Sequence, residues 1–335
     1  MKKRFREHRL ALFFACVAGL IYISHHFIIP FFLDAESEVY YPVTSQSYPD
    51  ETMLYAPRAH AAMEGRWISG DISIAEYPRG PAILPILNPI LLGGLGKILG
   101  SLKAGIVASD FIFPALIFLA LYFLAYEVSY RKQWSLIFAS LFIFFPKFGI
   151  FIPPVSLFNL REFGKVLLPF LQSQEPFYFS QFEEPKLTFL FFTLTLLFFL
   201  RAVKKGTGRS AVIAGIFFGL LFYTYLYDWA TILVAIALFF LWSLYQRNFR
   251  AAKQAAIAVC VGFLVSFGYW YNLWMLADFP NYQDVIARAG GEFSHAIRFS
   301  TVWKSYLRVL VLVFAFVAFW QKKDRRPIWV VEAML

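Results

Sequence analysis

The stretch GIVASDFIFPALIFLALYFLAYEV (105–128), followed by SYRKQ (129–133), determines the class of this protein. A helix of about 20 apolar residues crosses the roughly 30 Å hydrocarbon layer of a membrane. Over the whole chain, 59% of the residues are hydrophobic and 16% are charged, whereas soluble domains carry about 25% charged residues. The runs are continuous and do not alternate with period two, which argues against a transmembrane β-barrel. The sequence therefore predicts an all-α, polytopic membrane protein.

Similar apolar runs recur along the chain, and we expect about eight spans. The first run is longer than the apolar region of 7–15 residues in a signal peptide, so we predict an uncleaved span with a cytoplasmic N-terminus. One membrane domain (1–335) is expected, with extracytoplasmic loops at 33–104, 153–185 and 277–304. The expected spans are 10–33, 105–128, 134–152, 186–200, 211–227, 229–245, 255–276 and 306–320.

The net charge of +10 is gathered in short basic turns between the runs. This pattern is typical of cytoplasmic loops in the cell membrane and argues against a nucleic-acid partner. If residues 81–100 also crossed, the later basic turns would fall outside, so we assign 81–100 to an interfacial or re-entrant helix pair. Cys16 and Cys260 lie inside apolar runs and predict neither a disulfide nor a metal motif.

The first outer loop carries Asp50-Glu51, followed by Tyr55 and Arg58, with a helix expected at about 56–64. In a helix, positions three and four apart share a face. A carboxylate near the membrane surface is suited to general-base chemistry, or to holding a divalent cation such as Mg or Mn. The alternative is that Asp50 only caps the helix and Glu51 favours its positive end.

The second outer loop ends with Glu183-Glu184, followed by Pro185 and Lys186. Acids in the first turn and an early proline also describe an ordinary helix start. Both acidic pairs are expected on the same side of the membrane, which favours a functional interpretation. Asp50 and Glu183 are the expected ligands if a cation binds.

Positive charge in the outer loops opposes the topological bias and points to an anionic headgroup or phosphate. Arg58, Arg161 and Lys165 are the candidates for binding such a phosphate, and Lys186 belongs to the same outer group. The alternative for each is interfacial snorkelling. Two further features are weaker candidates. Side chains of the adjacent His25 and His26 should diverge on a helix, which favours packing over metal binding. Asp110 and Asp228 are acids at the edges of spans; acids within a membrane are functional candidates by default, but both can lie at the membrane interface.

The order of these parts resembles the GT-C superfamily of membrane glycosyltransferases, which includes protein O-mannosyltransferases and aminoarabinose transferases. The segments that carry the resemblance cover roughly the first 200 residues: Asp50-Glu51 with Tyr55, 63–67 with Asp71, 77–81, 85–100, 130–133 and 179–188.

The resemblance implies a sugar donor on a polyprenyl phosphate, used at the outer membrane face among membrane lipids, with an acceptor of unknown kind. It implies that Asp50 matches the catalytic carboxylate of the first loop, Glu51 its neighbour, and Glu183 or Glu184 the acid of the second loop. The chain is shorter than most members and lacks a soluble C-terminal domain, so a fragment and a partner-dependent enzyme both stay open. The rival hypothesis is a non-catalytic multi-pass protein, either a transporter of lipid or sugar-lipid or an assembly partner.

Overall fold

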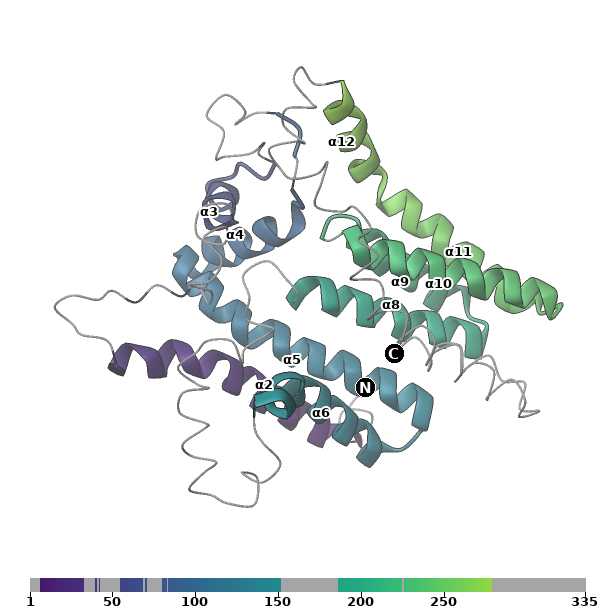
Figure 1. Cartoon of the computed structure of the whole chain (residues 1–335), viewed down its shortest axis with the longest axis horizontal. Coiled ribbons are helices and arrows are strands. Elements are labelled where there is room, and N and C mark those ends of the chain that lie inside the picture. Colours follow the sequence, from purple (N-terminus) through teal and green to yellow (C-terminus); the bar gives the residue numbers. More distant parts are fainter. Residues whose placement is uncertain are drawn as a thin grey trace.

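A computed structural model describes residues 7–32, 40, 42, 55–68, 70, 80–82, 84–151, 186–224 and 226–278. Within these residues the chain forms helices and no strand (Figure 1). Four helices are long and apolar enough to cross a membrane: α2 (Arg9–Ile28), α5 (Leu102–Ser129), α8 (Lys186–Lys205) and the part of α10 from Asp228 to Tyr245. The bent pair of α11 (Phe249–Val265) and α12 (Phe267–Ala277) gives a fifth if it counts as one span. These helices are those of a helical membrane protein.

The central helix, α5, begins and ends where its sequence provides caps. The Ser101 side chain accepts a hydrogen bond from the backbone N–H of Ala104, which satisfies a donor that the first turn leaves unpaired. At the other end Tyr130 takes a left-handed conformation with φ of 55°. This conformation stops the helix directly before the basic residues of the turn that leads into α6 (Lys132–Phe151).

Polar contacts show whether the helices next to α5 run parallel or antiparallel to it. Lys186, at the start of α8, pairs with Asp110 near the start of α5, and Arg201, late in α8, pairs with Glu127 late in α5. The helices α5 and α8 therefore run parallel. Late in α2, His26 contacts Asp110, while His8, before α2, contacts Tyr122. Helix α2 therefore runs antiparallel to α5.

The chain between α2 and α5 leaves and returns at one end of the bundle, where it forms α3 (Ala56–Met63) and α4 (Leu87–Leu99). The helix expected at 56–64 is confirmed by α3. The described residues of 81–100 contain a single helix, where a pair was expected. Helix α4 lies against α5 so closely that a Cβ atom at Gly105 would be 2.6 Å from the backbone nitrogen of Gly96. Small residues permit this approach.

On the other side of α8 the bundle continues through α9 (Gly208–Leu221), which packs between α8 and α11. A Cβ atom at Gly215 would lie 2.6 Å from the carbonyl oxygen of Ala258 in α11, so only glycine allows this close contact. Helix α9 is shorter than the expected span at 211–227, because the chain turns after Leu221. The span expected at 306–320 lies outside the described residues.

The basic turns lie together at the end of the bundle away from α3 and α4. Arg250, at the start of α11, donates a hydrogen bond of 2.8 Å to the carbonyl of Lys205, the last residue of α8. Lys204 donates to the carbonyl of Glu127, and its ammonium lies 4.7 Å from the centroid of the Tyr130 ring. The turns expected on one side of the membrane thus share one end of the described bundle.

Candidate functional site

Asp110 is the centre of a buried polar cluster at the end of the bundle near α3 and α4. Its carboxylate is fully buried. The Lys186 ammonium lies 2.7 Å from Oδ1, and the Nε2 atom of His26 lies 2.7 Å from Oδ2. The Ser109 hydroxyl accepts a hydrogen bond of 2.9 Å from Lys186. Three helices far apart in the sequence, α2, α5 and α8, therefore meet at one carboxylate.

The contacts of His26 determine which of its nitrogens carries the proton. As a carboxylate, Asp110 only accepts hydrogen bonds, so His26 Nε2 is the donor at that contact. In the neutral imidazole, Nδ1 is then the acceptor, and it lies 2.5 Å from the hydroxyl of Tyr40. The network therefore runs from the Tyr40 O–H through His26 to Asp110.

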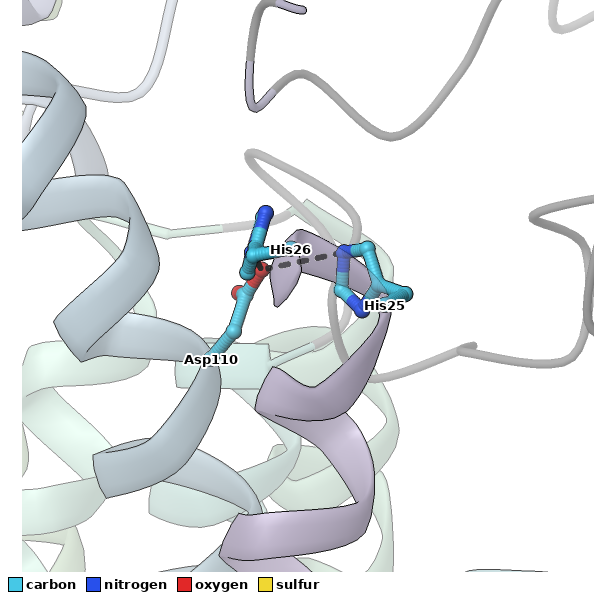
Figure 2. A group of neighbouring side chains, drawn as sticks. All are labelled: His25, His26 and Asp110. Carbon is cyan, nitrogen blue, oxygen red and sulfur yellow. Dashed lines mark hydrogen bonds and ion pairs between the residues drawn. The ribbon is translucent and has the colours of Figure 1, made fainter. Parts of the chain in front are cut away.

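His25 and His26 converge on Asp110, which contradicts the expectation that adjacent histidines diverge. Their ring centroids are 3.8 Å apart, and His25 Nε2 lies 3.9 Å from Asp110 Oδ2 (Figure 2). The Nδ1 atom of His25 is 2.7 Å from the carbonyl oxygen of Tyr22, one turn earlier in α2. This contact turns the His25 ring back along its own helix, while the His26 ring reaches across to α5. Both rings consequently approach the same carboxylate.

Asp110 and Lys186 are more deeply buried than a place at the interface implies. Asp110 is 0% and Lys186 1% exposed. Within the described residues, the charges of the Asp110 carboxylate and the Lys186 ammonium cancel each other. Lys186 thus neutralises a buried acid, although it was grouped with the candidates for an anionic headgroup. A buried ion pair is costly to create and more costly to break, because removing one partner leaves an uncompensated charge.

The cluster contains three ligand atoms that could surround a cation, since one atom each from His25, His26 and Asp110 lies within 4.8 Å of the others. Two imidazoles and one carboxylate suit zinc better than Mg or Mn. A bound ion would, however, replace the hydrogen bond between His26 and Asp110 and would lie beside the Lys186 ammonium. The observed contacts therefore favour an ion-paired, hydrogen-bonded network over a metal site.

The network is suited to moving a proton. Burial, with a smaller contribution from Asp110, raises the pKa of the Tyr40 phenol above its ordinary value. Tyr40 therefore remains a proton donor to His26 at neutral pH. An imidazole oriented by a carboxylate can accept a proton at one nitrogen while the other stays hydrogen-bonded.

Of the candidates from the sequence, the structure describes Arg58. It is 4% exposed, and its Nη2 atom donates to the carbonyls of Leu84 and Pro85 at 3.1 and 2.6 Å. Arg58 thus holds the segment before α4 against α3. The other candidates lie outside the described residues: Asp50, Glu51, Arg161, Lys165, Glu183 and Glu184.

Sequence reasoning considered His26, Asp110 and Lys186 separately and did not join them. The available signal was Asp110 itself, because an acid within an apolar run is a functional candidate by default. Its partners are set by the alignment of α2 and α8 along α5, which hydropathy does not reveal. Comparison of the chain with protein-family models, curated proteins and solved structures found no match in any of the three.

Proposed function

We propose that this protein is a GT-C-type glycosyltransferase that moves a sugar from a polyprenyl-phosphate donor to an acceptor at the extracytoplasmic face of the cell membrane. One observation supports the proposal: the helix that leads into the loop of Asp50 and Glu51 and the helix that follows Glu183 and Glu184 meet at Asp110. His26 lies in the helix that precedes the loop of Asp50 and Glu51. Lys186, which pairs with Asp110, follows Glu184 by two positions.

In the proposed reaction, Asp50 takes the proton of the acceptor hydroxyl while the lipid phosphate leaves the sugar. General-base help of this kind contributes about 10²–10⁴ in rate. Arg161 and Lys165 stabilise the departing phosphate by their charge. The proposed step does not use Arg58, whose guanidinium holds the segment before α4. If a divalent cation such as Mg or Mn takes part, Asp50 and Glu183 hold it and it supplies further charge stabilisation. Asp110, His26 and Lys186 are positioning residues.

The helix directions support the topology that this function requires. Because α2 and α5 are antiparallel, residues 33–101 start and finish at the same end of the bundle, which we assign to the outside. The basic turns after α5, α8 and α10 then face the cytoplasm. Spans α2, α5, α6, α8, α9, α10 and the bent pair α11–α12, with the run at 306–320, make up the eight spans of the proposal.

Transfer is tested in membranes with a panel of polyprenyl-phosphate sugars, by following loss of label from the lipid. Asp50→Asn keeps helix-capping ability but removes the base, so we expect transfer to fall by about 10²-fold or more with unchanged folding. Glu51→Gln and Glu183→Gln should lower it less. Glu64→Gln is the matched control, since Glu64 is a half-exposed acid of the same loop paired with Arg66. Full turnover by Asp50→Asn would refute the assignment of the base.

The topology is tested by labelling single cysteines with a membrane-impermeant reagent, after Cys16→Ala and Cys260→Ala have removed the native thiols. Ser69→Cys and Ser173→Cys should react from outside, and Ser210→Cys should react only after permeabilisation. Labelling of Ser210→Cys in intact cells would place both acidic loops in the cytoplasm. The donor is used outside, so this result would end the glycosyltransferase proposal.

A second candidate function, transport of a lipid or sugar-lipid, is favoured by one observation. Helices α11 and α12 meet at a 49° bend around Ser266, and transporters place their sites at broken helices. The transfer assay separates the candidates. A transporter moves intact labelled lipid between leaflets in vesicles, whereas a transferase releases the sugar from its lipid.

A further inference from the structure

A second site lies between the segment before α4 and the helices α9, α10 and α12. It is a cavity of about 200 Å³. Residues 82 and 84–86 form one wall, and the opposite walls come from the turn after α9, the start of α10 and the first half of α12. These elements gather at the same end of the bundle as Asp110, but beyond α8 from it (Figure 1).

Aromatic rings form part of the wall of this cavity. Phe222 and Trp229 stack with their ring centroids 4.4 Å apart and their planes 14° from parallel. The ring of Tyr269 meets Phe222 edge to face at 5.6 Å. Flat, rigid rings of this kind provide a large apolar contact surface at little cost in conformational entropy.

Trp229 also brings a hydrogen-bond donor that the described part of the chain leaves unused. Its indole N–H is buried and has no acceptor among the described residues. A buried donor without a partner costs about 1–3 kcal/mol, so most such groups in proteins have one. The cavity lining therefore calls for a ligand with an oxygen acceptor as well as an apolar face.

The wall opposite the rings is fixed in place by three sets of hydrogen bonds. The Asn272 amide accepts from the backbone N–H of Ala82 at 2.9 Å and donates to its carbonyl at 2.7 Å. The backbone N–H of Leu87 donates to the carbonyl of Tyr223 at 3.2 Å, and Arg58 holds Leu84 and Pro85 from behind. A wall held from both sides preserves the shape of a binding site.

We propose that this cavity binds a single pyranose ring. The C–H face of a pyranose packs on aromatic rings, and its hydroxyl or ring oxygen can accept from the Trp229 indole. The volume is below the roughly 300–1,000 Å³ of pockets for larger ligands, which suits one sugar ring. A prenyl chain would fill the apolar walls but would leave the indole N–H without an acceptor.

This inference rests on the proposed function, because in a glycosyltransferase the bound ring belongs either to the donor sugar or to a sugar of the acceptor. Its test measures binding and not transfer, so each proposal can fail alone. The probes are methyl pyranosides of glucose, mannose, galactose and N-acetylglucosamine. Their binding to the purified full chain in nanodiscs is followed by saturation-transfer NMR titration.

We expect at least one pyranoside to bind with a dissociation constant in the millimolar range. Trp229→Phe keeps the stacked ring but removes the donor, and should weaken binding roughly twofold to tenfold. Trp229→Ala should abolish it. Trp242→Phe, in the same helix but in its last turn, is the matched control and should bind like the wild type. No binding across the panel, or equal affinity of Trp229→Phe and wild type, would overturn the proposal.

Competition identifies the source of the ring. A farnesyl-phosphate-linked pyranose that displaces the methyl pyranoside, where farnesyl phosphate does not, supports the donor sugar. Failure of both to displace supports a sugar of the acceptor. Displacement by farnesyl phosphate alone would show that the cavity takes the isoprenoid chain, and the proposal of a pyranose site would be wrong.

Discussion

The two ends of the α5–α8 pair each hold a buried carboxylate, but in different surroundings. Asp110 is fully buried and its ion-pair partner Lys186 is 1% exposed. Glu127 is paired with Arg201 and Lys205, whose side chains are 25% and 59% exposed. One end is closed to water, and the other opens onto the basic turns.

The two ion pairs between α5 and α8 therefore have different roles. At the Glu127 end, the cations Arg201, Lys204 and Lys205 outnumber the acid, as in cytoplasmic turns that set the orientation of spans. At the Asp110 end, among the described residues, one ammonium neutralises one carboxylate, and imidazoles complete the contacts. Both pairs fasten α5 to α8, but only the Asp110 end provides the dry, hydrogen-bonded surroundings in which charged groups act strongly on one another.

The largest expected effect comes from breaking the closed pair. Asp110→Ala leaves the Lys186 ammonium buried without its partner, and we expect a loss of about 3–5 kcal/mol in the free energy of unfolding. Denaturant titration in detergent measures it. The double variant Asp110→Ala/Lys186→Met removes both charges and should regain much of the loss. A double variant as unstable as Asp110→Ala would show that the unpaired charge is not the cause.

A smaller effect is expected at the open end. Glu127→Gln should cost only about 0.2–1 kcal/mol, because Arg201 and Lys205 remain in contact with water. Added salt should reduce this cost, since exposed pairs are screened, whereas the cost of Asp110→Ala should change little. The same titration at low and high salt checks both. Equal salt dependence of the two variants would remove the distinction between the ends.

The smallest effect concerns pH at the open end, where His8 lies 2.7 Å from the Tyr122 hydroxyl. Burial, followed by the charge of Lys132, lowers the pKa of His8 below 6.5. The unfolded chain therefore takes up a proton at higher pH than the folded chain does. This contribution to stability is complete above the unfolded pKa and is lost as pH falls through 6.5 toward the folded value.

Thermal melts between about pH 7.5 and about pH 5.5 check this sign, since the window brackets the ordinary pKa of histidine. We expect His8→Gln to lose less stability over the window than the wild type. His60→Gln is the matched control for the loss of a histidine, because the His60 side chain is 53% exposed. A steeper slope for His8→Gln would contradict the direction of the shift.

Hydropathy and charge could predict the helices, because both are local properties. The run at 105–128 lies within α5, the helix expected at 56–64 is present as α3 (Ala56–Met63), and the basic turns meet at one end. Hydropathy could not distinguish one long helix from a short helix and a turn, so α9 is shorter than expected. The described part of 81–100 likewise contains one helix where a pair was expected.

The candidate site could be predicted only in part, because it depends on how the helices align along one another. The distance in sequence from His26 to Asp110 is 84 residues and from Asp110 to Lys186 is 76. Each of the three residues lies near the end of its own apolar run, where a polar side chain is common. Whether His26 and Lys186 contact Asp110 depends on the register of three helices. Arg58 was predicted from charge, which carried no information about the carbonyls that its guanidinium meets.

The side-chain bridge between Asn272 and Ala82 has a consequence for how the protein is made. The two residues are 190 positions apart, so Ala82 leaves the ribosome roughly 10–40 s before Asn272 at ordinary elongation rates. During that interval the segment before α4 has no α12 to fasten it. The aromatic cavity is therefore completed late in synthesis, and a nascent chain stalled before α12 would carry Asp110 and its cluster but no finished cavity.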